Sequence, residues 1–138
     1  MDILLDASAI MAILLNEPNR ERVIGLTDNT TLLSPEVISF EIGNALVNLF
    51  KKQKITEEGL FAAYNNYTLI PLRSIKVDTE KALKIACKYK IYAYDAYYLE
   101  TAYRLKLPLI TFDESMRKVG LDLKINILGE MAVGGEIG

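Results

Sequence analysis

The sequence predicts an α/β sandwich around a central, mainly parallel sheet. Short apolar runs alternate along the chain with segments whose apolar residues recur at helical spacing, as in parallel strands joined by helices. No internal repeat, linker or second compositional region interrupts the 138 residues, of which 51% are hydrophobic. We therefore expect one domain over residues 1–128, followed by a Gly-rich tail over residues 129–138 that frays.

The first elements follow from local signals. Asp2–Asp6 is a short apolar run ending in an acid, which fits a buried strand. A helix over Ala7–Leu15 has apolar residues at helical spacing, and Ser8 is available to cap it. A break follows, and the pattern then predicts a short helix over Arg20–Leu26 and a strand over Thr30–Leu33.

The middle of the chain begins with a helix-start signal. The run Ser34–Glu36 combines a capping hydroxyl, a proline and an acid, and it predicts a helix that reaches about Lys52. Thr56 precedes two acids and begins a helix that reaches about Tyr67. Leu69–Leu72 is expected to be a short extended segment.

The last part of the chain predicts three helices and two strands. Asp78 is a capping residue, proline is tolerated near the start of a strand, and glycine commonly ends a helix. The expected elements are a helix from Asp78 to Lys90, a helix from Tyr94 or Asp95 to Lys106, a strand over Leu107–Phe112, a helix over Asp113–Val119 ended by Gly120, and a strand over Lys124–Leu128.

Composition excludes several kinds of chemistry. Histidine is absent, which removes Ser-His-Asp and Cys-His catalysis and almost every zinc site. The single Cys87 cannot form an intrachain disulfide and suits a reducing compartment. No apolar run approaches the ~20 residues of a membrane span, and the N-terminus lacks the basic region of a signal peptide. We therefore expect a cytoplasmic protein without a membrane partner.

Two candidate site residues, Asp6 and Asp113, come directly after predicted strands. The carboxyl ends of parallel strands meet at one edge of a sheet, where ligands bind, so both acids are expected at that edge. Each also precedes a helix, and capping of that helix is the alternative interpretation. For Asp6, Ser8 could serve as the cap instead.

Glu41 is the acid whose helical phase is most informative. The period of 3.6 residues places Val37, Glu41, Asn44 and Asn48 on one narrow stripe with apolar residues on both flanks. We therefore expect a mostly buried helix whose polar stripe lines a cleft. A thin solvent-exposed face is the alternative.

Asp95 lies in a run rich in tyrosine and alanine. Leu99 and Ala102 fall on its own helix face, whereas Glu100 and Arg104 form an i,i+4 pair that is expected on the solvent side. Asp95 therefore begins a stripe that faces the core. Capping of the helix is compatible with this position.

Four carboxylates at one edge of a sheet predict a metal site. Two carboxylates ~4 Å apart repel by roughly 4 kcal/mol at an effective dielectric constant of about 20, so the cluster needs protonation or a cation. An all-oxygen ligand set selects Mg²⁺ or Mn²⁺. Such ions activate water and stabilise leaving oxygens in phosphodiester hydrolysis.

The chain resembles a PIN-domain nuclease of the small VapC-type toxin kind. The resemblance extends from Ile3 to about Leu128. It rests on four motifs in this order: D-A-S at Asp6–Ser8, E-I-G-N-A-L at Glu41–Leu46, Y-D-A-Y-Y-L at Tyr94–Leu99 and L-I-T-F-D at Leu109–Asp113.

The resemblance implies a PIN-like three-layer α/β/α sandwich and a metal-dependent endoribonuclease, the toxin of a toxin–antitoxin pair. The implied catalytic and metal-binding residues are Asp6, Glu41, Asp95 and Asp113, with Ser8 and Asn44 as supporting residues. It further implies Mg²⁺ or Mn²⁺ as cofactor, an RNA substrate, a homodimer held by the N-terminal half, and a small antitoxin partner. Many relatives carry a further acid after the position of Asp113, where this chain offers only the adjacent Glu114.

Two other classes remain as alternatives. A non-catalytic PIN-like module would bind RNA or protein without cleavage. A phosphoacceptor receiver domain also gathers aspartates at a sheet edge, but it needs paired acids after the first strand and a lysine after a late strand. The net charge of −2 means that RNA binding would depend on local basic patches. The candidates are the run Lys51-Lys52-Gln53-Lys54, and Lys88, Lys90, Arg104 and Lys106.

Overall fold

The computed structural model describes residues 1–129. The predicted frayed tail therefore lies outside the described residues, apart from Gly129. In chain order the elements are β1 (Asp2–Leu5), α1 (Ala7–Leu14), α2 (Arg20–Thr27), β2 (Thr31–Pro35), α3 (Ile38–Lys51), α4 (Glu57–Thr68), β3 (Leu72–Ile75), α5 (Thr79–Tyr89), α6 (Ala93–Leu105), β4 (Leu109–Ile110), α7 (Glu114–Asp122) and β5 (Ile127–Leu128).

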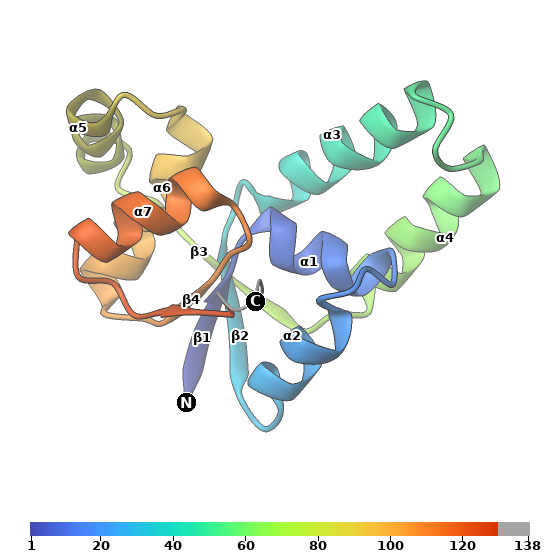
Figure 1. Ribbon diagram of the computed structural model, residues 1–138, viewed down its shortest axis with the longest axis horizontal. Coiled ribbons are helices and arrows are strands. Elements are labelled where there is room, and N and C mark those ends of the chain that lie inside the picture. The colour runs from blue at the N-terminus through green and yellow to red at the C-terminus, as the bar shows by residue number, and fades with distance from the viewer. Residues whose placement is uncertain (130–138) are drawn as a thin grey trace.

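The strands form one sheet in the order β3-β2-β1-β4-β5, and every pairing is parallel. Helices α1 to α4 lie on one side of the sheet and α5 to α7 on the other (Figure 1). This division follows from right-handed crossovers, because the chain moves outward from β1 to β3 and then returns to the other side of β1. The predicted three-layer α/β/α sandwich with a parallel sheet is confirmed.

The core lies on both faces of the central strand. Leu4 and Leu5 of β1 are fully buried, as are Ile10 of α1 and Leu99 of α6. β1 pairs with β2 and with β4, so both of its edges are covered. The sequence of a strand buried on both faces is continuously apolar, as observed here. None of the helices formed by residues 1–129 combines the length and apolar character that crossing a bilayer requires.

The expected helix start at Ser34–Glu36 is wrong, because β2 continues through Pro35. Ser34 and Pro35 pair with Ser74 and Ile75 of β3, and the Ser34 hydroxyl donates to the carbonyl oxygen of Leu5 at 2.5 Å. Proline is tolerated at this end of the strand since it has no ladder hydrogen bond to donate. Helix α3 consequently begins only at Ile38.

Further boundaries also differ from the sequence prediction. β4 and β5 are limited to Leu109–Ile110 and Ile127–Leu128, shorter than the expected Leu107–Phe112 and Lys124–Leu128. The third strand is Leu72–Ile75 and not Leu69–Leu72, because it pairs at the edge of the sheet, where half-exposed polar residues are tolerated. Gly120 does not end α7 but lies inside it. A Cβ at Gly120 would lie 2.7 Å from Cδ1 of Ile127, so glycine allows the helix to approach β5.

Helix α3 is less buried than expected. Ile38, Ile42 and Leu46 are its buried residues, whereas Phe40 is 70% exposed and Val47 is 45% exposed. The reason is that α3 and α4 pack against each other and extend away from the sheet (Figure 1).

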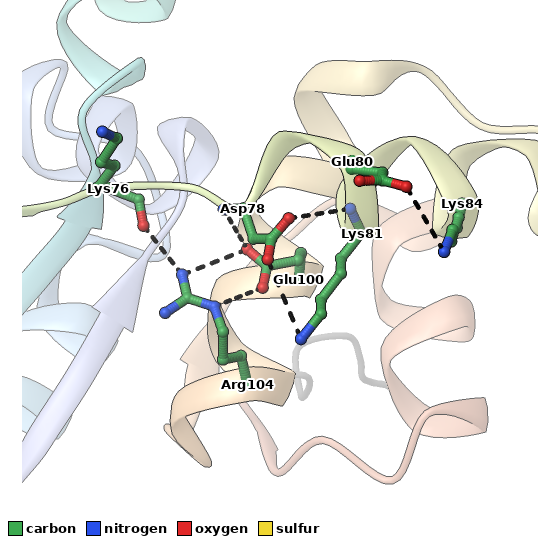
Figure 2. A network of polar contacts seen from close by, with 7 residues as sticks. All are labelled: Lys76, Asp78, Glu80, Lys81, Lys84, Glu100 and Arg104. Atoms are coloured by element: carbon green, nitrogen blue, oxygen red, sulfur yellow. Dashed lines mark hydrogen bonds and ion pairs between the residues drawn. The ribbon is translucent and has the colours of Figure 1, made fainter.

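The prediction that Glu100 faces solvent is wrong. Glu100 is 2% exposed, and it accepts hydrogen bonds from the Asp78 N–H at 3.1 Å and from Arg104 Nε at 2.6 Å (Figure 2). The first turn of α5 covers this part of α6, so Glu100 is compensated by a guanidinium and an amide and not by water. The i,i+4 pair with Arg104 is present, but it is partly buried.

Candidate metal-dependent nuclease site

Asp6 is a buried N-cap held by three hydrogen bonds. It directly follows β1, and its Oδ1 accepts from the Ala9 N–H at 2.9 Å and from the Ser8 hydroxyl at 2.7 Å. Its Oδ2 accepts from the Thr111 hydroxyl at 2.5 Å. Burial raises the pKa of Asp6 to about 6, against the lowering effect of these hydrogen bonds, and the charge of Asp113 raises it further. Asp6 therefore caps α1, and the alternative of Ser8 as the cap is wrong.

Asp113 is the N-cap of α7 and lies three residues beyond the end of β4. Its Oδ1 accepts from the Met116 N–H at 2.8 Å, so its capping role is confirmed. Its own N–H donates to the Thr111 hydroxyl oxygen at 3.0 Å, and Thr111 in turn donates to Asp6. A single buried hydroxyl thus connects the two acids that follow neighbouring strands.

Glu41 projects from the first turn of α3 toward α6. Tyr98, which is 1% exposed, donates its hydroxyl to Oε1 of Glu41 at 2.5 Å. Burial raises the pKa of Glu41, although the bond from Tyr98 opposes this, and Asp113 adds to the rise. Burial also raises the pKa of Tyr98 well above its usual value, so the hydroxyl keeps its proton and remains a donor.

A hollow of about 240 Å³ opens beside Glu41. It is lined by residues of α1, α3 and α6, namely Ala7, Phe40, Glu41, Asn44, Ala45, Asn48 and Tyr94. Glu41, Asn44 and Asn48 therefore line a hollow together, as predicted, but Asn44 and Asn48 are exposed, so this part of the stripe is also a solvent-exposed face. Phe40 and Tyr94, which are 70% and 46% exposed, add aromatic rings to its walls.

Asp95 is not a helix cap. Tyr92 is the N-cap of α6, and Asp95 lies in the first turn. Leu99 and Ala102, on the same face, are buried as predicted. Burial raises the pKa of Asp95 to about 6, and the charges of Asp113 and Glu41 raise it further. Within residues 1–129, no side chain or backbone group donates a hydrogen bond to this carboxylate.

The four acids act on one another electrostatically. Asp113 raises the pKa of each of the other three carboxyls, so all four lie at the same edge of the sheet. No lysine of residues 1–129 forms an ion pair with any of them. The cluster therefore concentrates negative charge at this edge of the sheet.

The donor set fits a hard divalent cation in its chemistry. It consists of carboxylate and hydroxyl oxygens, which Mg²⁺ and Mn²⁺ prefer. In their present positions, however, no three acids of the described chain form a ready-made ligand cage. Binding would therefore require some ligands to act through water or to rotate toward the ion, as is usual for Mg²⁺.

Ser8 and Asn44, the two predicted supporting residues, differ in how directly they contact the four acids. Ser8 both donates to Asp6 and accepts from the Phe112 N–H at 2.9 Å, so it connects the turns after β1 and β4. Asn44 lines the hollow, but its amide forms no hydrogen bond within residues 1–129. Glu114 pairs with Arg117 at 3.6 Å and has a side chain that is 67% exposed, which turns it away from the cluster.

Two functional side chains were missed at the level of sequence. Thr111 lies inside the L-I-T-F-D motif, and a threonine two residues before an acid at a strand end could have suggested a bridging role. Tyr98 lies inside Y-D-A-Y-Y-L, but its partner is 57 residues away, and no local signal distinguishes it from the neighbouring tyrosines.

A parallel sheet with carboxylates gathered at its carboxyl edge defines a class of α/β proteins suited to metal-ion chemistry. Within that class, the PIN domain model matches residues 3–121 of this chain. The chain belongs to the PIN domain family, whose members are generally nucleases. The sheet order also differs from the 2-1-3-4-5 order of receiver-type folds, so the receiver alternative is wrong.

Solved structures show the same fold. A protein from Pyrobaculum aerophilum named PAE2754 is 22% identical, with a TM-score of 0.62 over 90% of this chain and 98% of that chain. The Rickettsia felis VapBC2 structure, described as bound to a DNA fragment from their promoter, is 13% identical with a TM-score of 0.62, covering 92% and 97% of the two chains. FitAcB from Neisseria gonorrhoeae is 17% identical with a TM-score of 0.61, covering 92% and 96%. A search of curated proteins returned no match.

Proposed function

We propose that this protein is a metal-dependent endoribonuclease and the toxin of a toxin–antitoxin pair, acting in the cytoplasm. The observation that carries the proposal is the group of four acids at the carboxyl edge of a PIN fold, where Asp113 raises the pKa of each of the other three. Charge of this kind is costly unless a cation compensates it. Membership of the PIN family gives the chemistry, and the solved toxin–antitoxin structures of the same fold support the biological role.

Asp6, Glu41, Asp95 and Asp113 would hold Mg²⁺ or Mn²⁺, directly or through water. Bound there, the ion supplies an activated water and offsets charge that develops on the phosphoryl oxygens. Asp95 is the residue best prepared for this role, because its carboxylate accepts no hydrogen bond within the described chain and a cation would relieve its repulsion with Asp113 and Glu41. Asp6, by contrast, is fixed by three donors and orients the edge of the site.

The hollow beside Glu41 supports a nucleic-acid substrate with unpaired bases. Phe40 and Tyr94 are exposed aromatic rings at its walls, and such rings stack bases irrespective of sequence. Asn44 and Asn48 offer amides that can bind sugar or phosphate oxygens. Single-stranded RNA can bind both, because its bases stack on the rings and its sugar and phosphate oxygens accept from the amides.

Helices α3 and α4 support the expectation of protein partners, an antitoxin and a second copy of the chain. They extend from the sheet (Figure 1) and expose large apolar side chains, namely Phe40, Val47, Phe50, Phe61 and Tyr64. Exposed apolar patches of this kind are typical of interaction surfaces. The proximity of Phe40 to Glu41 means that a partner on this surface would also cover the hollow.

Cleavage of total RNA, with either Mn²⁺ or a chelator present, tests the proposed function. We expect Mn²⁺-dependent fragments that carry 5′-phosphate and 3′-hydroxyl ends. Intact RNA that nevertheless binds the protein would instead support the alternative, a non-catalytic PIN-like module.

A further inference from the structure

A second hollow lies at the opposite edge of the sheet from the acidic cluster. It has a volume of about 910 Å³ and is lined in part by Leu107 and Pro108, which lead into β4, and by Ile125 and Asn126, which lead into β5. The acidic cluster follows the carboxyl ends of the same parallel sheet. The two hollows are therefore separate, and we name this one the basic hollow.

The basic hollow combines an apolar floor with a cationic rim. Its apolar lining comes from α5, from the end of α6 and from the segments before β4 and β5. Its basic lining residues are Lys81, Lys84, Arg104, Lys106 and Lys124. Glu100, the single acid in the described lining, is buried and bound to Arg104, so the lysines set the charge of the rim (Figure 2).

The lysines of the rim are available for a ligand. Lys81 and Lys84 lie 4.0 Å from Asp78 and 3.8 Å from Glu80, with lysine side chains 66% and 75% exposed (Figure 2). Exposed ion pairs of this length contribute little and exchange readily. Lys106 and Lys124 form no ion pair with any residue of the described chain. A protein with a net charge of −2 thus presents a local basic site.

The cations continue from the basic hollow toward the acidic cluster. Lys81, Lys84 and Lys88 occupy positions i, i+3 and i+7 of α5, so they share one helix face over about 10 Å. Only Lys90–Tyr92 separates the end of α5 from the start of α6, where Asp95 lies. The stripe therefore leads from the basic hollow to the end of α6 that carries a proposed metal ligand.

We propose that the basic hollow and the lysine stripe of α5 form a second RNA-binding site, which holds an unpaired nucleotide of single-stranded RNA outside the acidic cleft. The hollow accommodates a base, and Tyr103, which is 59% exposed in its lining, offers a ring for stacking. The lysines neutralise successive phosphates along the strand. This inference rests on the proposed function, since it is the substrate of the acidic cluster that the site would hold.

An RNA strand fits the observations better than an acidic peptide. The cations are spread along a stripe as well as around the hollow, which matches the evenly spaced phosphates of an extended strand. An exposed aromatic ring beside cations is also the usual combination in proteins that bind single strands. An acidic peptide needs neither the ring nor the continuation toward Asp95.

The binding of a fluorescein-labelled single-stranded RNA, measured at several salt concentrations, tests the site. A length of about 16 nucleotides is enough to fill a typical single-strand-binding site. All variants carry Asp95→Asn so that the RNA stays intact. Lys106→Gln with Lys124→Gln should lower the slope of log affinity against log salt by about 1.4, because each lost phosphate contact contributes about 0.7 for single strands. Arg22→Gln with Arg73→Gln, on α2 and β3, removes the same charge outside both hollows and should leave the slope unchanged.

A second pair of variants tests stacking. Tyr103→Ala should weaken RNA binding about tenfold without changing the salt slope, since stacking releases no counterions. Tyr64→Ala is the matched control, because Tyr64 is 47% exposed and lies on α4, outside the basic hollow and the lysine stripe. Its effect on RNA affinity should be less than twofold.

The outcomes separate this inference from the proposed function. Equal slope changes in the lysine pair and in the arginine control pair would overturn the site. So would binding of a fluorescein-labelled polyglutamate peptide to the basic hollow when RNA does not bind there. If the wild-type protein cleaves RNA but the variants of the basic hollow behave like their controls, only the proposed RNA-binding site at the basic hollow is wrong. If wild-type protein binds RNA through this site without cleaving it, the proposed ribonuclease activity is wrong and the site stands.

Discussion

Tyr98 donates its hydroxyl to Oε1 of Glu41 at 2.5 Å, and this bond joins α6 to the first turn of α3. The bond leaves the second carboxylate oxygen of Glu41 free to face the hollow and the other acids. It also fixes the rotamer of a long side chain that would otherwise lose entropy on binding a ligand. Tyr98 is therefore a positioning residue for the proposed site.

Replacement of Tyr98 by Phe should weaken Mn²⁺ binding while preserving the fold. The lost bond to a charged group contributes about 1.5–3 kcal/mol, part of which appears as lower metal affinity. Isothermal titration with Mn²⁺ measures this affinity independently of RNA cleavage. Tyr97→Phe is the matched control, because the Tyr97 hydroxyl forms no hydrogen bond within residues 1–129, and it should bind Mn²⁺ like the wild type. Equal affinities for the two variants would refute the positioning role.

Asp95→Asn should stabilise the metal-free protein at neutral pH. The pKa of Asp95 is raised from 3.8 to about 6, so its proton binds more tightly in the folded state. Its contribution to stability is complete below about pH 4 and is lost as the pH rises through about 6. Because Asp95 is half exposed, we expect a gain of only about 1 kcal/mol for the amide at pH 7.5, vanishing near pH 4. Urea unfolding at both pH values measures the difference.

Asp28→Asn provides the control for this pH dependence, since Asp28 follows α2 and is remote in sequence from every site motif. It should change stability by the same small amount at both pH values. A loss of stability in Asp95→Asn at pH 7.5 would mean that Asp95 has a structural partner and not an unrelieved charge.

Divalent cations should raise the melting temperature, and more so at pH 7.5 than at pH 5. Binding to the folded state alone stabilises it by about 1.4 kcal/mol at ten times the Kd, which corresponds to several degrees. At pH 5 the carboxyls of Asp6 and Asp95, with pKa values of about 6, are largely protonated and compete with the ion. Differential scanning fluorimetry with Mn²⁺ measures both shifts. A response to Mn²⁺ that is equal at the two pH values would contradict the carboxylate site.

Thr111→Val should destabilise the protein more than Thr101→Val. Both threonines are fully buried, but Thr111 links Asp6 to the Asp113 N–H, whereas Thr101 bonds only to the Tyr97 carbonyl of its own helix. Loss of the Thr111 hydroxyl leaves a buried carboxylate oxygen and an amide without partners, which costs about 1–3 kcal/mol. Chemical unfolding of both variants compares the costs, and equal values would show that the link between the acids carries no special stability.

The sequence was sufficient for part of the placement of the acids. Asp6 and Asp113 could be assigned to one edge because parallel strands align their carboxyl ends, and Glu41 could be assigned to one stripe with Asn44 and Asn48 from helical phase. These arguments use only local periodicity and the order of elements. They do not depend on side-chain partners from distant segments.

Features that depend on distant partners could not be predicted. Glu100 and Arg104 have the spacing of a solvent pair, and only the packing of α5 over α6 shows that Glu100 is buried. Ser34 looks like a helix cap until the pairing of β2 with β3 and the bond to Leu5 are known. Gly120 resembles a helix end because its contact with Ile127 is not local.

The most direct test of the central claim is the cleavage of a labelled single-stranded RNA by the wild type and by Asp95→Asn, each with Mn²⁺ and with a chelator. The wild type should cleave only with Mn²⁺, and Asp95→Asn should not cleave in either condition although it remains folded. Cleavage by the wild type in the presence of the chelator, or full activity of Asp95→Asn with Mn²⁺, would contradict a metal site built on these four acids.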